Sequence, residues 1–372
     1  MSSSFLFLSA NTPWVYALAN RLAQRDPVRA VRFFDWQVYL SNYPSWPEGP
    51  SADALARTTR VMPTGYTGIL EPVVRPIITW MIRRWQHELR EQSGSSPVVV
   101  APYPYLAPWV RDVPSDRLVY YNLDAYALYR PNRKARIRKQ ERELVERSCC
   151  TLCLSVHQVD QIQKRHPAHA DRIHHFPLGV TEAFLNPAPN TPLEPKTVAY
   201  VGNLTNRVDW GFVNEVAERC PSLTFVFVGE ADAEASEPPW ERERTRAFQR
   251  ANVRFVGRVP QEAVTQYYWS AGVNWIPYDP AHPFNRASCP TKVMDGIGSG
   301  RPIISTDVPE CRQYPRWIDI VRTPDEAAEA LHKAVEREHQ GQAQVNFARS
   351  NTWADRAETF RQILNGPVSS PA

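Results

Sequence analysis

The residue whose position most suggests ligand chemistry is Lys292, in the segment NRASCPTKVMDGIGSGRPIIST. Pro290 precedes a predicted short helix, Lys292 falls in its first turn, and Gly298 and Gly300 end it. A cation in the first turn opposes the helix dipole, which favours anions there. A bound phosphate would relieve this conflict, because the lysine and the helix end could hold it together. Asp295, three residues on and on the same face, could accept hydrogen bonds from ribose hydroxyls or form an ordinary surface pair with Lys292.

A second loop with the features of an anion site lies in YVGNLTNRVDW. A predicted strand ends at Val201 and is followed by Gly202, Asn203 and a polar turn before the next helix. Glycine lets a ligand approach the backbone, and the start of a helix supplies unpaired N–H groups. Arg207 adds a cation at the same end. We expect a diphosphate here, and an ordinary tight turn is the alternative.

A carboxylate, Asp124, follows a predicted strand in RLVYYNLDAYALYRP. Its immediate neighbours are apolar or aromatic, an environment that suits a general base. A reaction in which a hydroxyl group attacks needs such a base to take the proton of that hydroxyl. The alternative is an aspartate that caps the helix after the strand.

A fourth loop, SANTPW, follows the first predicted strand. Ligands of parallel sheets bind outside the carboxyl ends of the strands, so Asn11, Thr12 and Trp14 could contact an acceptor. A helix N-cap explains the same pattern equally well. Tyr103, in PYPYLAP after a later strand, is a further acceptor candidate.

Short apolar runs that alternate with amphipathic helix patterns must position these loops. In the first half, strands are predicted at Phe5–Leu8, Ala30–Phe34, Val98–Ala101, Leu118–Tyr121, Thr151–Leu154 and Ile173–Phe176, and helices at Trp14–Gln24, Val73–Glu91 and Ala135–Arg147. In the second half, strands are predicted at Thr197–Val201, Thr224–Val228, Val253–Val256, Val273–Ile276 and Pro302–Ser305, and helices at Trp210–Arg219, Gln261–Ser270, Lys292–Ile297, Asp325–Glu338 and Trp353–Leu364. This alternation predicts parallel sheets covered by helices on both faces.

The two halves are separated by FLNPAPNTPLEPK, in which four prolines fall within nine residues. Proline interrupts helices and ladders, so this segment predicts a linker. We therefore expect an α/β protein of two Rossmann-like parallel-sheet domains facing each other across a cleft. The expected bounds are a first domain over residues 1–183, a linker over 184–196, a second domain over 197–345, and a C-terminal segment over 346–372. The helix of that last segment could pack back on the first domain, and its tail GPVSSPA is expected to be disordered.

The composition excludes several classes of protein. The net charge of the 372-residue chain is only +4, which gives no reason to expect a nucleic-acid partner. The six cysteines show no paired spacing typical of zinc, and we interpret them as buried thiols. No apolar run reaches the ~20 residues that span a bilayer, and MSSSFLFLSA is too short for a leader peptide. We expect a soluble, cytoplasmic protein.

One segment, ITWMIRRWQHELRE, suggests contact with a membrane surface. Trp80, Met81, Ile82 and Trp85 alternate there with arginines. Tryptophan and arginine on an amphipathic helix can lie at a lipid interface, although a packed helix with a solvated basic face is the alternative.

The loops, taken in order, resemble the GT-B glycosyltransferases, specifically the GT4-like, teichuronic and exopolysaccharide-type bacterial enzymes. The resemblance is strongest over Val198–Glu310, which includes YVGNLTNRVDW, FVFVGE, NVRFVGRVPQE, VNWIPY and the segment around Lys292. In the first half it includes RLVYYNLDAY and FPLGVTEAF, and it is weakest over residues 35–95. It implies an acceptor-binding first domain and a second domain that binds a nucleotide-sugar, with UDP as the expected nucleotide.

The resemblance implies a role for ten residues of the second half. Lys292, Arg207, Gly202, Asn203 and Thr291 would bind the donor diphosphate.

A second set, Gly229, Gly257, Arg258, Tyr278 and Asp295, would form the nucleotide base and ribose pocket. Asp295 departs from the glutamate usual in the family. The upstream acidic residue of the retaining enzymes and the histidine expected after Val98–Ala101 are both missing.

These departures favour a different subgroup, because RLVYYNLDAY resembles the inverting xanthan-type glucuronosyltransferase. The resemblance implies that Asp124 is the base of a single in-line displacement and that neither metal nor other cofactor is needed. The acceptor would be a glycan or a polyprenyl-linked carrier, with possible peripheral contact at the inner face of the cytoplasmic membrane. Two alternatives remain: a sugar-nucleotide 2-epimerase on the same fold, and a catalytically inactive module that binds nucleotide or glycan.

Overall fold

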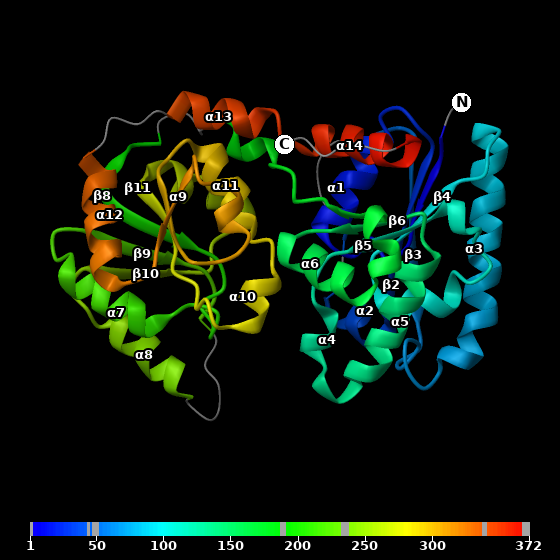
Figure 1. Ribbon diagram of the computed structural model, residues 1–372, viewed down its shortest axis with the longest axis horizontal. Coiled ribbons are helices and arrows are strands. Elements are labelled where there is room, and N and C mark those ends of the chain that lie inside the picture. Colours follow the sequence, from blue (N-terminus) through cyan, green and yellow to red (C-terminus); the bar gives the residue numbers. More distant parts are fainter. Residues whose placement is uncertain are drawn as a thin grey trace. The chain divides into compact units, whose positions relative to one another are not determined.

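The structure is a computed structural model that describes residues 3–42, 45–46, 52–186, 191–231, 238–336 and 341–366. The chain divides into two compact units (Figure 1). Unit 1 comprises Met1–Pro177 and Trp353–Ala372, and unit 2 comprises Leu178–Thr352. Each unit is a parallel sheet with helices, so the expected fold class of two Rossmann-like parallel-sheet domains is confirmed.

Unit 1 contains a seven-stranded parallel sheet with the order β3-β2-β1-β4-β5-β6-β7. Its strands are β1 (Phe5–Phe7), β2 (Val28–Asp35), β3 (Leu55–Met62), β4 (Val98–Ala101), β5 (Leu118–Asn122), β6 (Cys150–Cys153) and β7 (Ile173–His175). Its α-helices are α1 (Pro13–Leu22), α2 (Trp36–Asn42), α3 (Glu71–Ser93), α4 (Tyr126–Tyr129), α5 (Lys134–Arg147), α6 (Val156–Arg165) and α14 (Trp353–Asn365). Short 3₁₀ turns are η1 (Pro104–Trp109), η2 (Ser115–Arg117), η3 (Pro131–Arg133) and η4 (Pro167–Arg172). The edge strand β3 was not predicted, because polar residues interrupt its apolar pattern (LARTTRVM).

The two faces of strand β1 pack against different helices. Leu6 belongs to a core cluster with Ile78 and Ile82 of α3. Phe5, which points to the opposite face, lies 5.7 Å between ring centroids from Phe360 of α14. Alternate residues of a strand face opposite ways, so a wholly apolar strand needs helices on both faces.

The helix α14 lies far along the chain from the rest of unit 1 and is joined to it by an ion pair as well as by Phe360. Arg361 contacts Asp26 at 2.8 Å, and both side chains are largely buried. Its guanidinium also donates to the carbonyl of Leu22 at the end of α1. The last helix therefore completes the core of unit 1.

Unit 2 contains a six-stranded parallel sheet with the order β10-β9-β8-β11-β12-β13. Its strands are β8 (Glu194–Val201), β9 (Thr224–Val228), β10 (Val253–Gly257), β11 (Ala271–Ile276), β12 (Ile303–Thr306) and β13 (Ile318–Val321). Its helices are α7 (Trp210–Arg219), α8 (Pro239–Phe248), α9 (Val264–Ser270), α10 (Pro283–Ala287), α11 (Thr291–Ser299), α12 (Pro324–Glu336) and α13 (Gly341–Arg349), with 3₁₀ turns η5 (Glu182–Phe184), η6 (Gln261–Ala263) and η7 (Cys311–Gln313). The short edge strand β13 was not predicted.

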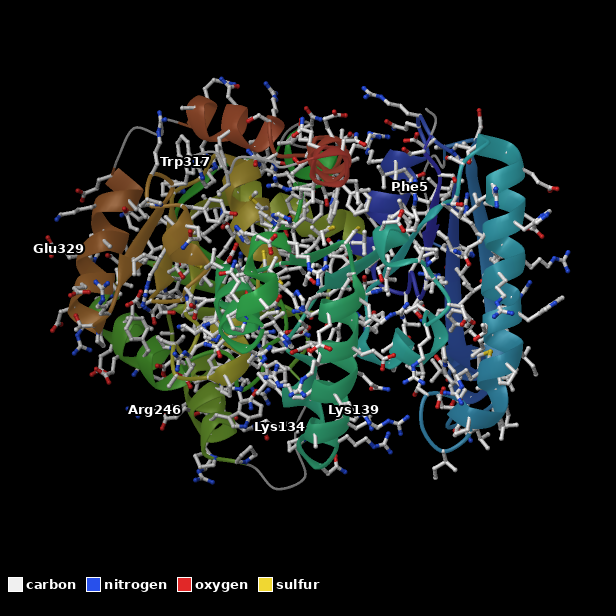
Figure 2. All side chains as sticks on the ribbon, turned by 45° about the vertical axis from the view of Figure 1, so that its right-hand side comes forward. Phe5, Lys134, Lys139, Arg246, Trp317 and Glu329 are labelled. Carbon is white, nitrogen blue, oxygen red and sulfur yellow. The ribbon has the colours of Figure 1, made fainter. Side chains whose placement is uncertain are left out.

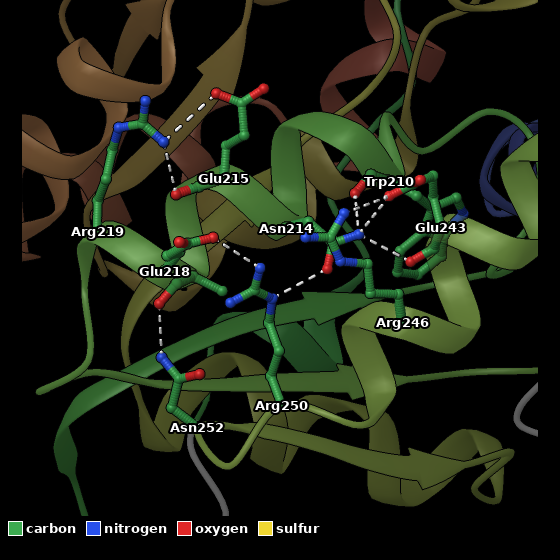
Figure 3. Close-up of polar contacts among 10 residues, drawn as sticks. Trp210, Asn214, Glu215, Glu218, Arg219, Glu243, Arg246, Arg250 and Asn252 are labelled. Carbon is green, nitrogen blue, oxygen red and sulfur yellow. Dashed lines mark hydrogen bonds and ion pairs between the residues drawn. The ribbon is translucent and has the colours of Figure 1, made fainter.

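The helices α7 and α8 are connected through one buried amide (Figure 3). The side-chain nitrogen of Asn214 donates to the carbonyl oxygens of Trp210 and Glu243, at 3.0 and 2.9 Å. Its oxygen accepts from Arg250 at 3.0 Å, and Arg250 also donates to Glu218. This network fixes α7, whose first turn follows the loop that contains Gly202.

The proline-rich segment between the halves is only partly irregular. The two units divide between Pro177 and Leu178, and the turn η5 follows within unit 2. The expected linker of residues 184–196 ends inside β8, which begins at Glu194 and contains Pro195. Proline is tolerated at the start of a strand, which explains the difference. Residues 187–190 of that segment, and 367–372 of the tail, lie outside the described residues.

Within the described ranges, the structure contains no helix whose length and apolarity would suffice to cross a bilayer.

Replacing Phe360 with alanine should destabilise unit 1 by about 3–5 kcal/mol, because a fully buried ring is removed from a packed aromatic cluster. Urea unfolding measured by tryptophan fluorescence tests this. Gln362→Ala, an exposed position on the same helix, is the control and should change little. Equal stability of the two variants would contradict the assignment of α14 to the core of unit 1.

Candidate functional site

Three glycines mark the carboxyl edge of the unit 2 sheet, where β8, β9 and β10 end. The backbone φ angles of Gly202, Gly229 and Gly257 are 145°, 149° and 85°. The Gly202 amide donates to Val228, and the Gly229 amide donates to Gly257. A Cβ atom on Gly229 would lie only 1.9 Å from the carbonyl oxygen of Gly202, so the two loops can approach this closely only without a side chain there.

Lys292 reaches this glycine loop from the first turn of α11. A Cβ atom on Gly202 would lie 2.3 Å from Nζ of Lys292. The ammonium donates to the hydroxyl of Tyr278 at 3.0 Å and lies 4.9 Å from the ring centroid of Tyr200. Within the described part of the chain it forms no ion pair with Asp295, and Lys292 is buried, so the alternative of an exposed surface pair is wrong. The structure thus brings two of the predicted diphosphate residues together.

Arg207 lies on the same tyrosine as Lys292. Its guanidinium carbon is 5.2 Å from the ring centroid of Tyr278, while Nε donates to Asn285 at 2.8 Å and Nη2 donates to Ser288 at 3.0 Å. Burial acts to raise the pKa of Tyr278, but Lys292 and Arg207 together bring that pKa below its usual value. The two cations are held by neutral groups, which leaves their positive charge available to an anion.

The remaining predicted donor residues lie at or near this edge. Asn203 is exposed, and its carbonyl accepts from Tyr200 at 2.9 Å. Thr291 begins α11. Arg258, after Gly257, is exposed and pairs with Glu230 at 3.6 Å. Tyr278, which we expected at the base or ribose, lies instead between the two cations of the diphosphate set.

Asp295 lies one turn after Lys292 on α11. Burial raises its pKa to about 7, and the nearby Lys292 opposes that rise. Near neutral pH the carboxyl group therefore exchanges between protonated and ionised forms. Either form can accept hydrogen bonds from hydroxyl groups, and only the protonated form can donate one.

The glycine pair of α11 has a packing explanation. A Cβ atom on Gly296 would lie 3.0 Å from Cδ1 of Ile303, and one on Gly298 would lie 3.2 Å from Cβ of Phe184. The helix therefore packs tightly on β12 and on η5. These glycines let α11 pack in this position.

A second candidate site is a cavity of about 590 Å³ in unit 1, at the carboxyl ends of its strands. Four of the predicted residues line it together: Thr12, Trp14, Tyr103 and Asp124. Asn11 does not, because its side-chain nitrogen donates to the carbonyl of Phe33 at 2.8 Å. Asn11 was placed in the acceptor set from its loop alone, and the structure gives it a role in joining β1 to β2.

Asp124 follows β5 and is held by two hydrogen bonds. Its Oδ1 accepts from the Ala125 amide at 2.7 Å, and its Oδ2 accepts from the hydroxyl of Tyr129. The cap position of α4 is Ala125, so the alternative of an N-cap aspartate is wrong. Thr12, by contrast, both lines the cavity and caps α1, since its hydroxyl accepts from the Val15 amide at 3.4 Å.

Sequence reasoning missed most of the aromatic wall of this cavity. The rings of Tyr103 and Tyr105 stack at 5.4 Å, and Tyr126 packs on Tyr103 at 5.3 Å. Burial raises the pKa of all three phenols, so they remain neutral hydrogen-bonding groups. The spacing of tyrosines in PYPY and DAYALY was the available signal. Apolar faces with polar tips are typical of surfaces that bind sugar rings.

Ser9, which follows β1, connects this edge of the sheet to the tyrosines of the cavity. Its φ of 52° is the one positive value among the described non-glycine residues, and its hydroxyl lies 2.8 Å from that of Tyr105. A strained backbone conformation of this kind persists only where surrounding contacts hold it, and it is common near binding sites.

The described residues contain no group of three or more His, Cys, Asp or Glu side chains arranged to hold a metal ion.

The comparisons with known proteins agree with this geometry. Residues 195–338 match the family of glycosyl transferases group 1. The family match lies within unit 2. A protein of Bacillus subtilis (strain 168), TuaH, named as a teichuronic acid biosynthesis glycosyltransferase, is 22% identical over 246 residues, or 62% of this chain and 60% of that protein. The chain thus spans less than two thirds of the length of that relative.

Solved structures are similar in fold over nearly the whole chain. Anabaena HepE, in a complex with UDP and glucose, has a TM-score of 0.69 at 12% identity, with 97% of this chain and 99% of that chain covered. WaaG, a glycosyltransferase involved in lipopolysaccharide biosynthesis, has a TM-score of 0.62 at 16% identity, with 98% of this chain and 100% of that chain covered. The expected GT-B fold is confirmed, and residues 195–338 are similar to the glycosyl transferases of group 1.

The raised pKa of Asp295 makes a prediction about stability. Between the ordinary pKa of an aspartate, near 4, and about 7, folded unit 2 binds more protons at Asp295 than the unfolded chain does, so stability falls as the pH rises through this range. Asp295→Asn removes that loss and should raise the melting temperature at pH 8 more than at pH 5. Calorimetry without nucleotide tests this, with Asp319→Asn on β13 as the exposed control. An identical effect at both pH values would contradict a raised pKa.

Proposed function

We propose that the protein transfers a sugar from a nucleotide-diphosphate donor to a hydroxyl group of an acceptor. The observation that carries the proposal is the position of Lys292, whose ammonium lies against the glycine loop of unit 2 and donates to the phenol oxygen of Tyr278. Burying a cation that has no carboxylate partner costs free energy, and a bound anion offsets that cost. A diphosphate supplies that charge.

A UDP-sugar is the donor we propose. Structures of Anabaena HepE contain UDP, UDP with glucose, and UDP-glucose, on the same fold. Lys292 and Arg207 would bind the diphosphate, with Gly202, Asn203 and Thr291 offering backbone groups to its oxygens. The positive charge of these side chains would stabilise the departing diphosphate, so the proposed reaction needs no metal ion.

Asp124 is the base in the proposed mechanism. It would take the proton from the acceptor hydroxyl while that oxygen attacks the anomeric carbon and the bond from carbon to the diphosphate oxygen breaks. One in-line displacement inverts the anomeric configuration and releases the nucleoside diphosphate. Tyr129, which donates to Asp124, would orient the carboxylate. Transfer requires the donor held by unit 2 and the acceptor held by unit 1 to meet during the reaction.

The acceptor we propose is a glycan or a polyprenyl-linked glycan of surface-polysaccharide synthesis. The stacked tyrosines and Trp14 offer apolar faces to a sugar ring, and their polar tips offer hydrogen bonds to its hydroxyls. Such a reaction belongs in the cytoplasm, at the inner face of the membrane. An epimerase converts its donor without an acceptor and would have no need of this second cavity.

Lys292→Ala should weaken UDP binding on the order of 10- to 100-fold, because a charge-assisted contact to the diphosphate is lost. Isothermal calorimetry with UDP measures it. Lys333→Ala, an exposed lysine of unit 2 paired with Glu329, is the control. Unchanged affinity in the Lys292 variant would refute the diphosphate assignment.

Asp124→Asn should lower the rate of transfer by about 100-fold or more while UDP affinity stays the same, because the base is removed and the donor site is intact. A screen of UDP-sugars by thermal shift first identifies the donor. Product formation is then followed with an added glycan acceptor, with Asp116→Asn as the exposed control in unit 1. Full activity of the Asp124 variant would eliminate the proposed base, and conversion of the donor without acceptor would indicate an epimerase.

A further inference from the structure

Exposed apolar side chains are concentrated in one part of unit 1. Of the eleven large hydrophobic side chains exposed among the described residues, nine belong to unit 1, and eight of these fall within residues 36–80. Single exposed apolar residues need no explanation, but a concentration of them marks an interaction surface.

The helix α3 carries the longest part of this surface. Val73, Ile77 and Trp80 form a stripe along it, preceded by Ile69, and the exposed fractions of Ile69 and Val73 are 90% and 71%. The opposite face of α3 is buried in the core, so the helix has apolar residues on both sides. Two residues that the sequence suggested for membrane contact, Ile82 and Trp85, belong to that buried face. Of the two tryptophans that suggested membrane contact, only Trp80 belongs to the exposed stripe.

The helix α2 carries further exposed apolar side chains, at the edge of the sheet from which the loop to α3 leaves. Trp36 and Leu40 are exposed on it, at 45% and 65%. Asp35, at the end of β2, accepts a hydrogen bond at 3.0 Å from Thr64 in the loop that leads to Ile69. Both segments follow the carboxyl ends of neighbouring parallel strands, β2 and β3, and lie at the same edge of the sheet.

A basic segment adjoins the same loop. Residues 125–140 contain Arg130, Arg133, Lys134, Arg136, Arg138 and Lys139 and no acidic residue. Arg136 donates to the carbonyl of Thr67 at 3.3 Å, and a Cβ atom on Gly68 would lie 3.9 Å from Nη1 of Arg133. Figure 2 labels Lys134 and Lys139 on the helix α5 of this segment. Cations and exposed apolar side chains thus meet at the residues just before Ile69.

We propose that this docking rim, which consists of the exposed side chains of α2, of residues 69–80 and of the basic segment 130–139, binds an anionic lipid surface. The proposal rests on the proposed function and adds the surface through which the acceptor is reached. Apolar side chains would enter the interface between headgroups and acyl chains, while arginine and lysine pair with lipid phosphates. A second copy of the chain fits less well, because a two-fold symmetric contact through the rim would bring its basic segments together.

The rim also borders the cavity that contains Asp124. Arg130, Arg133 and Arg136 line that cavity and belong to the basic segment. Docking would therefore place the cavity mouth at the lipid headgroups. An acceptor carried on a lipid could present its sugar to Asp124 without leaving the bilayer.

Vesicle flotation with the full chain tests the proposal. Wild-type protein should float with phosphatidylcholine vesicles that contain phosphatidylglycerol, far less with phosphatidylcholine alone, and less as the salt concentration rises. Arg133→Gln with Arg136→Gln should weaken binding to the anionic vesicles on the order of tenfold and flatten the salt dependence. Ile69→Ser with Ile77→Ser should weaken binding at every salt concentration.

The control variants carry the same changes in unit 2. Arg246→Gln with Lys333→Gln, and Leu193→Ser, alter exposed residues there and should float like the wild type. UDP affinity is measured on every variant, which separates this proposal from the previous one. Wild-type protein that binds UDP but no anionic vesicle would overturn the docking rim alone. Equal loss of flotation in the control variants, or rim variants that change the oligomeric state and leave flotation intact, would overturn it too.

Discussion

The positive charge of Lys292, held in the first turn of α11, is the constraint on which the geometry of unit 2 depends. Its ammonium occupies the space that a side chain on Gly202 would need. The loop after β9 also lies directly on the loop after β8, which requires a second glycine at Gly229. Gly202, Gly229 and Lys292 are spread over about 90 positions of the sequence and look independent there. In the structure they pack together around the charge of Lys292.

The side chains around Lys292 and Arg207 that hold these cations are uncharged. Tyr278 and Tyr200 surround the ammonium with rings and a phenol oxygen, and Asn285 and Ser288 bind Arg207. A carboxylate in these positions would pair with the cations and remove the attraction for a diphosphate. Burial raises the pKa of the nearby Asp295 to about 7, so this carboxyl group competes weakly for the lysine near neutral pH.

The sequence was sufficient for features that depend on local pattern. Buried parallel strands appear in the sequence as apolar runs, and eleven of the thirteen strands were predicted from them. The two missed strands, β3 and β13, lie at sheet edges. Exposed side chains interrupt their apolar pattern. Thr12, Trp14, Tyr103 and Asp124 were predicted to be at one edge because parallel strands end together, and they line one cavity. The direction of a side chain is a tertiary property, which is why Asn11 was misassigned to this cavity and why Tyr105 and Tyr126 were missed.

The exposed face of α3 is a second case in which the sequence does not show which way side chains point. A helix with apolar residues on both sides has no strong periodicity, so its sequence cannot say which side enters the core. Packing against β1 and β2 buries Ile78, Ile82 and Trp85, because these residues share the face that meets the sheet. Val73 and Ile77 are then exposed by geometry. Contact with an anionic bilayer, as proposed above, would remove these exposed side chains from water and give their exposure a physical reason.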